Sequence, residues 1–187
     1  MASFAVLLRA VNVGPGLRVT SADLVGAAED AALGDARTLL NSGNLVVTAG
    51  TSGATRPADV ARLVQDCLGE RLGQDVAAVG LSTEHLEAIA RANPFSAAAR
   101  DHPSQLQVHV PFGDLNEAGI ARLDLSNAGR EMLGTGAGVL YVHYVDGIGR
   151  SKLTPKVIDT AVGAPTTARN WNTITKLRAA CAGLASR

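Results

Sequence analysis

The most chemically varied segment of this chain is the nine-residue stretch RNWNTITKL, residues 169–177. It holds the only tryptophan of the protein, two asparagines, two threonines and two cations, and it contains no acidic residue. A helix that begins near Trp171 would place Arg169 and Lys176 close to its N-terminus, where the helix dipole disfavours cations and favours anions. Free backbone amides at such a helix start bind phosphate-like groups. The segment therefore predicts an anion site at the start of the last helix.

The same nine residues also permit a purely structural interpretation. In that interpretation Asn170 or Asn172 caps the helix, Trp171 packs into the core, and the two cations are solvated. The residue types alone do not decide between the two interpretations.

The distribution of charge supports a site near the C-terminus. Net charge is zero, so bulk charge does not indicate a nucleic-acid partner. From Asp146 onward, however, seven cations accompany only two anions, and all three lysines of the chain lie there (Lys152, Lys156 and Lys176). Chance placement on a solvated face is the alternative.

Two glycine turns resemble phosphate-binding loops only superficially. Residues 14–19 (GPGLRV) lack the third glycine of a dinucleotide fingerprint, and residues 147–152 (GIGRSK) lack the order and spacing of a Walker motif. The second turn nevertheless runs into a predicted helix with Ser151 or Thr154 as its N-cap, and free amides there could hold an anion. A plain capped helix is the alternative.

Other catalytic and metal-binding chemistry has little support in the sequence. The four histidines share no metal-ligand spacing, and His109 falls on the polar face of a predicted strand. Cys67 and Cys181 fall on apolar helical stripes and are predicted to be buried, reduced thiols, which indicates a cytoplasmic protein. No apolar run approaches the ~20 residues needed to span a bilayer, so no membrane partner is expected. We expect no metal and no cofactor, and the catalytic residues, if any, are unknown.

The periodicity of the apolar residues predicts an α+β protein with two ferredoxin-like (split βαβ) units and an extra C-terminal helix. The expected units are residues 1–81 and 82–187. Each unit is expected to place its helices over one face of its sheet. The residues expected to be largely buried are Val6, Leu8, Val46, Leu63, Leu106, Val108, Leu140, Val142 and Trp171.

Strands and helices alternate regularly in the expected order. In the first half we expect strands at 3–9, 36–40, 44–48 and 75–80, helices at 21–32 and 57–72, and a turn at Asn41-Ser42-Gly43. In the second half we expect helices at 82–93, 116–123 and 151–162, a final helix from about 171, and strands at 105–110, 129–133, 139–145 and 166–169.

Five motifs in this order resemble a known family: LLRAVNVG, LNSGNLVV, ANPF, GIGRSKLT and ARNWNTITKL. Together they are similar to the bacterial family known as domain of unknown function 1697, from about Phe4 to Leu177. The resemblance implies a small α+β fold and no settled activity, so it supplies no catalytic residues. The first loop departs from the family pattern at Ala10 and at residues 15–17, whereas Arg9, Asn12 and Arg18 fit it.

Polar residues at strand ends and helix starts make up the predicted ligand site. We expect them to converge in a cationic, asparagine-rich groove between the two halves and to bind a phosphate-bearing ligand. The favoured ligand is a nucleotide, whose base could stack on Trp171 or on the two tyrosines; the second is nucleic acid. The candidates are Arg9, Asn12, Arg18, Ser42, Asn44, Arg150, Ser151, Lys152, Arg169, Asn170, Trp171, Asn172 and Lys176.

Two other classes of function remain open from the sequence. One is an enzyme of unknown reaction in which Lys152 or Lys176 clamps a phosphate or serves as a perturbed amine. The other is a structural or interaction protein whose polar motifs only hold the two halves together. Fold alone does not choose among these classes.

Overall fold

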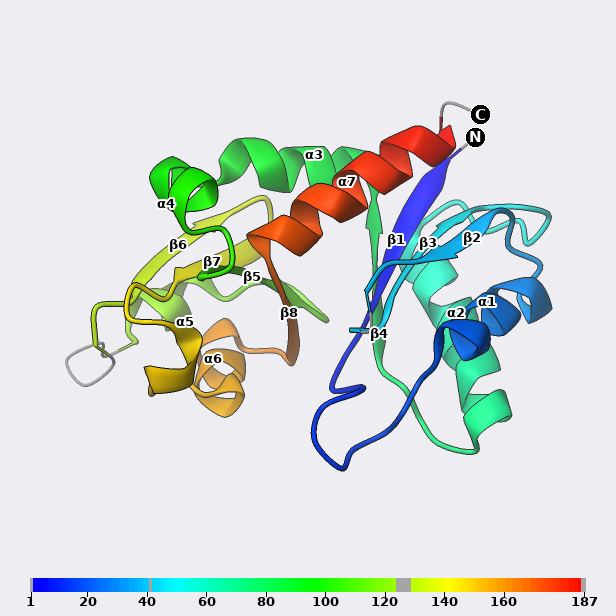
Figure 1. The fold of residues 1–187 in the computed structure, drawn as a ribbon, viewed down its shortest axis with the longest axis horizontal. Helices are drawn as coiled ribbons and strands as arrows, with labels where there is room; N and C mark the ends of the chain where they lie inside the picture. Colours follow the sequence, from blue (N-terminus) through cyan, green and yellow to red (C-terminus); the bar gives the residue numbers. More distant parts are fainter. Residues whose placement is uncertain (1, 41, 124–128, 186–187) are drawn as a thin grey trace. The chain divides into compact units, whose positions relative to one another are not determined.

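A computed structural model describes residues 2–40, 42–123 and 129–185 (Figure 1). The chain divides into two compact units: unit 1 comprises residues 1–87 and 176–187, and unit 2 comprises residues 88–175. Each unit contains one four-stranded antiparallel sheet with helices, and a long helix follows the last strand. This architecture confirms the predicted pair of ferredoxin-like units with an extra C-terminal helix.

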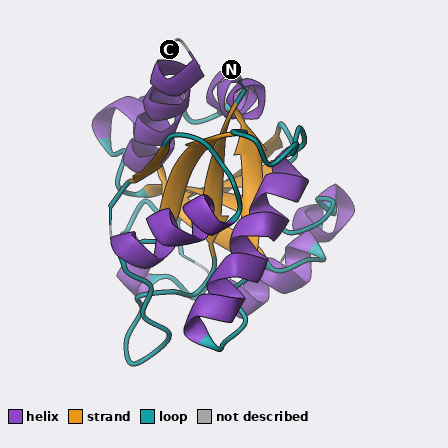
Figure 2. Ribbon diagram, turned by 90° about the vertical axis from the view of Figure 1, so that its right-hand side faces the viewer, coloured by secondary structure: helices purple, strands orange, loops and turns teal. Residues whose placement is uncertain are grey.

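Unit 1 has the strand order β2-β3-β1-β4, and every neighbouring pair of strands is antiparallel. This order is that of a split βαβ fold, because the β2-β3 hairpin places β3 between β1 and β2. Figure 2 shows helices in front of the strands of this sheet. The elements are β1 (Ser3–Leu8), α1 (Ser21–Asp30), β2 (Ala36–Thr38), β3 (Asn44–Thr48), α2 (Pro57–Leu72) and β4 (Ala78–Ser82).

Alternate residues of β1 build the core of unit 1. Phe4, Val6 and Leu8 belong to a buried cluster with apolar residues of α1 and α2, as period-2 alternation predicts. The intervening Ala5 and Leu7 are also fully buried, so both faces of β1 are covered. Among the residues expected to be buried in unit 1, Leu63 is only half-buried and packs at the edge of this cluster.

Unit 2 repeats the topology with the strand order β6-β7-β5-β8, again antiparallel throughout. Helices α5 and α6 lie together on one side of this sheet (Figure 1). The remaining elements of the chain are α3 (Thr83–Ala92), α4 (Ser96–Asp101), β5 (Leu106–Pro111), α5 (Glu117–Ala121), β6 (Met132–Gly136), β7 (Val139–His143), a 3₁₀ turn (Ile148–Arg150), α6 (Pro155–Val162), β8 (Thr166–Asn170) and α7 (Trp171–Ala185).

The structure corrects several sequence expectations about the elements. The strand expected at 75–80 spans Ala78–Ser82, and the strand expected at 129–133 spans Met132–Gly136. The helix expected from Ser151 begins at Pro155, because Thr154 is its N-cap and proline is favoured in the first turn. The short helix α4 was not expected at all. The expected turn at residues 41–43 includes Asn41, which lies outside the described residues.

Helix α7 belongs to both units. The predicted halves placed the whole final helix after residue 82, whereas its residues from Lys176 onward pack with unit 1. Ser3 at the start of β1 donates a hydrogen bond from its Oγ to the carbonyl oxygen of Cys181, at 2.7 Å. This bond ties the first strand of unit 1 to the last helix.

The two cysteines are free thiols in different environments. Cys181 is buried, as predicted, and burial raises its pKa to about 12. Cys67 is only half-buried, so the expectation that both are buried is wrong for Cys67, although burial still raises the pKa of its thiol. In the described part of the chain, no helix is both long and apolar enough to cross a membrane.

Candidate functional site

The predicted ligand residues fall into both units. Arg9, Asn12, Arg18, Ser42, Asn44 and Lys176 belong to unit 1, and the other seven belong to unit 2. The idea of one groove shared by both halves stays a prediction.

A pocket of about 550 Å³ in unit 1 contains two of these residues, Asn12 and Arg18. This volume lies within the range of small-molecule sites in proteins. Gly43 also lines the pocket and is flanked in sequence by the predicted Ser42 and Asn44. The lining residues come from the loop after β1, the start of α1 and the β2-β3 turn, and they are Asn12, Arg18, Val19, Thr20, Ser21, Leu24, Leu40 and Gly43.

Asn12 shapes the loop that presents Arg18. Its backbone is left-handed, with φ +58°, which asparagine tolerates better than most residues. Its Nδ2 donates to the carbonyl oxygen of Val19 at 2.9 Å, and its Oδ1 accepts from the Val19 amide at 3.0 Å. The amide group therefore bridges the two ends of the loop, so Asn12 positions Arg18.

Arg18 carries the charge of the pocket. It is exposed, and its one hydrogen bond to the described residues is a long one of 3.4 Å to the carbonyl oxygen of Gly14. Within the described chain it has no carboxylate partner, and no carboxylate lines the pocket. A guanidinium in this state is free to form the paired hydrogen bonds that it makes with phosphates.

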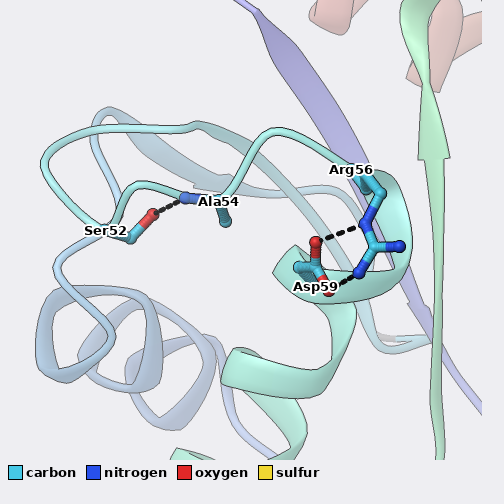
Figure 3. Close-up of polar contacts among 4 residues, drawn as sticks. All are labelled: Ser52, Ala54, Arg56 and Asp59. Carbon is cyan, nitrogen blue, oxygen red and sulfur yellow. Dashed lines mark hydrogen bonds and ion pairs between the residues drawn. The ribbon is translucent and has the colours of Figure 1, made fainter.

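Several other surface arginines of the protein are paired with carboxylates. Arg56, just before α2, donates from Nε and Nη2 to the carboxylate of Asp59 at 2.7 and 2.8 Å (Figure 3). Arg56 also lowers the pKa of the Asp59 carboxyl group. Similar pairs join Arg71 to Asp30 and Arg100 to Asp101. Arg18 therefore differs from these arginines in having a free cationic group beside a pocket.

The start of α1 supplies hydrogen-bond donors to the same pocket. The N-cap is Thr20, and it forms a capping box with Asp23, whose carboxylate accepts from the Thr20 amide at 2.8 Å. The hydrogen bond from the Thr20 hydroxyl and that from its amide hold the pKa of Asp23 below its usual value. The amides of Ser21 and Ala22 have no acceptor within the helix. Ser21 Oγ accepts from Thr38 Oγ1 at 3.1 Å, which leaves the hydroxyl hydrogen of Ser21 able to donate to a ligand.

The predicted residues of the β2-β3 turn stabilise the turn itself. Asn44 is fully buried, and its Nδ2 donates to the carbonyl oxygen of Leu39 and to Ser42 Oγ, both at 2.8 Å. Gly43 has φ +68°, and its carbonyl oxygen accepts from the Leu8 amide at 2.8 Å. Asn44 and Gly43 therefore stabilise the turn that contributes Leu40 and Gly43 to the pocket lining.

Replacement of Asn44 by alanine is expected to lower the free energy of unfolding by about 1–3 kcal/mol, because the Leu39 carbonyl group loses a buried donor. Urea denaturation measures this change. Thr51→Ala is the control, since Thr51 is exposed and should change stability by less than about 0.5 kcal/mol. Equal stability of the Asn44 variant and the wild type would show that the Asn44 side chain does not stabilise the turn.

In unit 2, three predicted residues lie in the loop before α6. Ser151 Oγ accepts a hydrogen bond from the Leu153 amide at 3.0 Å, so it shapes the loop. The hydroxyl of Thr154 caps α6 by accepting from the Val157 amide at 3.4 Å. Arg150 and Lys152 are exposed on this loop. They remain candidates for anion binding.

The segment that follows serves structural roles in part. Arg169 lies in β8, is only 7% exposed, and donates to Thr167 Oγ1 and to the carbonyl oxygen of Ala168, both at 2.8 Å. Burial lowers its pKa to about 10, so it stays protonated at neutral pH. Asn170 caps α7, because its Oδ1 accepts from the amide and the hydroxyl of Thr173 at 3.0 and 2.9 Å. The capping alternative is therefore confirmed for Asn170.

The remaining predicted residues lie at the start of α7. Trp171 is half-buried, so the expectation that it is a core residue is wrong. Its amide donates to the carbonyl oxygen of Pro103 at 3.1 Å. Asn172 and Lys176 are exposed, as a ligand-binding role requires.

Similarity to known proteins extends over most of the chain. The profile of the family described as "Protein of unknown function (DUF1697)" matches residues 1–141. The chain belongs to this family. The family match spans every residue that lines the unit 1 pocket, whereas Arg150, Lys152, Arg169 and Lys176 lie beyond it.

The fold also occurs in a solved structure, "The structure of conserved bacterial protein SP0830 from Streptococcus pneumoniae". The TM-score is 0.72 at 20% sequence identity, and the alignment covers 96% of this chain and 98% of that chain. At this identity the likeness shows a common fold. No curated protein matches the chain.

A second pocket of this protein lies in unit 2, between α5 and α6, with a volume of about 470 Å³. Its lining combines two exposed cations, Arg122 and Lys156, with the half-buried apolar residues Leu123 and Val157. None of the sequence-predicted site residues lines it. This pocket is therefore a competing location for anion binding, which mutagenesis can distinguish from the pocket in unit 1.

Sequence reasoning misjudged one buried histidine. His109 was expected on the polar face of its strand, but it is buried, and its Nε2 has no hydrogen-bond partner among the described residues. Its neighbour in the sheet register is Leu140, which packs in the core with residues of α5 and α6. Burial lowers the pKa of His109 to about 4, although the carboxylate of Asp159 acts in the opposite direction.

Proposed function

We propose that this protein binds a phosphate-bearing small molecule in the pocket of unit 1, with Arg18 as the main anion-binding residue. The observation that carries the proposal is an exposed guanidinium without a carboxylate partner in the described chain, at the rim of a pocket of about 550 Å³. The amides at the start of α1 and the hydroxyl of Ser21 add neutral donors, and phosphate oxygens accept bonds from both kinds of group.

A small molecule fits this site better than nucleic acid does. The pocket has the size of a small-ligand site, and no aromatic residue is among the described residues that line it. Tyr141 and Tyr144 are fully buried, so the expectation that these tyrosines stack on a base is wrong. Single-stranded nucleic acid is bound mainly by aromatic stacking and a basic groove, and this pocket offers one cation.

The proposal also places the protein in the bacterial cytoplasm. Its two cysteines are free, as is usual in a reducing compartment. Phosphate esters are common small molecules there.

Binding of inorganic phosphate and phenyl phosphate, measured by calorimetry and thermal shift, tests the proposal. Arg18→Gln is expected to weaken both ligands roughly tenfold to a hundredfold, because a charged hydrogen bond contributes about 1.5–3 kcal/mol. Arg62→Gln is the matched control, since Arg62 is an exposed arginine on α2 that lines none of the described pockets. Binding should also weaken with added salt.

Two further variants separate the competing sites. The double variant Lys152→Met/Lys176→Met tests the predicted cationic segment, and Lys156→Met tests the α5-α6 pocket. Both should bind phosphate like the wild type and keep its stability, because all three lysines are exposed. If Arg18→Gln binds phosphate like the wild type and the double lysine variant does not, the site lies at the C-terminal cations. If Arg18→Gln binds phosphate like the wild type and Lys156→Met does not, the site lies in the α5-α6 pocket of unit 2. An absence of phosphate binding in the wild type would overturn the proposal.

A further inference from the structure

Leu40, on the rim of the unit 1 pocket, combines two unfavourable properties. Its backbone is left-handed, with φ +60°, a conformation in which a leucine Cβ crowds the following carbonyl oxygen. Its side chain is 51% exposed, so burial does not offset this strain. Exposed leucines are common and left-handed residues occur in turns, but a leucine that is both is unusual.

The turn itself requires only the backbone conformation. The Leu39 amide donates to the Asn44 carbonyl oxygen at 3.0 Å, and the Asn44 side chain donates to the Leu39 carbonyl oxygen, so the turn is closed by residues on either side of Leu40. Glycine or asparagine would adopt the same conformation with less strain. Leu40 is also absent from the hydrophobic core of unit 1. The leucine side chain therefore has no evident role in folding.

The pocket offers a role for this side chain. Leu24 and Val19 are buried apolar residues of the lining, and Leu40 adds an exposed apolar surface to the same pocket. Arg18 and Ser21 give the pocket a polar part. The lining thus combines hydrogen-bond donors that suit a phosphate with apolar side chains that suit a hydrophobic group. Residues held in strained backbone conformations, such as Leu40, are often found at binding sites.

We infer that the natural ligand is a phosphate monoester of an apolar organic group, and that Leu40 covers this group when the ligand binds. The inference rests on the proposed phosphate site and specifies its ligand. Arg18 and the start of α1 take the phosphate, and the hydrophobic part of the ligand removes the leucine side chain from water. Inorganic phosphate and esters of polar alcohols would lack this second interaction and bind more weakly.

The variant Leu40→Gly tests the inference because it keeps the left-handed backbone and removes the apolar side chain. Wild-type protein should bind phenyl phosphate more tightly than glycerol phosphate or inorganic phosphate. Leu40→Gly should weaken phenyl phosphate roughly fivefold to tenfold, as expected for the loss of a half-buried leucine contact, and leave inorganic phosphate unchanged. Its melting temperature should equal or exceed that of the wild type, since glycine relieves the strain.

Ala32→Gly is the matched control. Ala32 is also an exposed residue of unit 1 with a left-handed backbone, φ +53°, but it does not line the pocket. It should share the gain in melting temperature and show wild-type binding of all three ligands.

The outcomes separate this inference from the proposed function. Unchanged phenyl phosphate binding by Leu40→Gly, with inorganic phosphate still dependent on Arg18, overturns the inference and leaves the phosphate site intact. A large loss of stability in Leu40→Gly also overturns it, since the leucine would then serve the fold. Failure of wild-type protein to bind any of the three phosphates would remove both proposals together.

Discussion

Acidification from pH 7 to pH 4 is expected to lower the free energy of unfolding by about 3 kcal/mol through His109. The folded protein buries this side chain in its neutral form and holds its pKa at about 4, against a usual value of 6.5. Each unit of difference between the folded and unfolded pKa is worth about 1.4 kcal/mol. His109 Nε2 has no acceptor among the described residues, so a proton gained there would be buried without a partner.

The sign and the pH window follow from the depressed pKa. Between pH 6.5 and pH 4 the unfolded chain binds a proton at His109 that the folded chain does not, so stability falls as the pH falls. Above pH 6.5 the contribution is complete and constant. Hydrogen bonds from Arg56 and Arg130 lower the pKa of Asp59 and Asp146, which moves the titration of these carboxylates away from the window in which His109 acts.

Urea denaturation of wild type and His109→Leu at several pH values between 7 and 4.5 measures this contribution. The wild type should lose roughly 1.4 kcal/mol per pH unit below pH 6 through His109, and the variant should lack that slope. His102→Leu is the control, because His102 is exposed. Parallel pH profiles for wild type and His109→Leu would show that His109 does not control the acid response.

Gly43→Ala is expected to lower the free energy of unfolding by about 3 kcal/mol. A Cβ on Gly43 would lie 2.6 Å from Val11 Cγ2 and 2.9 Å from Leu8 Cβ, closer than non-bonded carbon atoms approach. The backbone there is left-handed, with φ +68°, which adds strain for alanine. Overpacking of this kind costs about 1–3 kcal/mol and the backbone strain about 1 kcal/mol more.

Gly53→Ala separates the two contributions. Gly53 has φ +74°, and a Cβ there would meet no atom within 4 Å, so only the backbone strain of about 1 kcal/mol applies. Thermal and urea denaturation of the two variants give the difference directly. Equal losses in both variants would indicate that Val11 and Leu8 move aside without cost.

The sequence predicted the elements whose patterns are local. Residues 57–72 were expected as a helix because proline favours the first turn and an apolar stripe follows, and both bounds of α2 agree. Residues 44–48 were likewise expected as a strand and form β3. Helix α4 was missed because its six residues are too few to show a helical period.

The local sequence pattern could not predict burial that depends on tertiary contacts. His109 alternates with apolar neighbours and so looked solvent-facing, but α5 and α6 cover that face of the sheet as well. Trp171 was expected to be largely buried, yet it is half-buried at the start of α7.

The candidate site was only partly predictable for a related reason. Asparagine side chains serve ligands and backbone groups equally well, and Asn12, Asn44 and Asn170 all proved to bond to neighbouring residues of their own loops or turns. Residue type identified the loop around Arg18 as polar, but not that the arginine lacks a carboxylate partner within the described chain. Leu40 could not be identified as a candidate from the sequence, because no sequence pattern indicates that a leucine adopts a left-handed backbone conformation.

The packing of residues from Lys176 onward with unit 1 sets an order in time for the folding of this protein. Strand β1 is made before residues 88–175, whereas the segment from Lys176 that packs with unit 1, and that Ser3 contacts at Cys181, is made after them. Residues 88–175 emerge in between, which at about 5–20 residues per second takes roughly 4 to 18 s. Unit 2 is continuous in sequence and can fold as soon as its own residues have emerged, whereas the first part of unit 1 must wait until residues 88–175 have been made before the segment from Lys176 can pack with it.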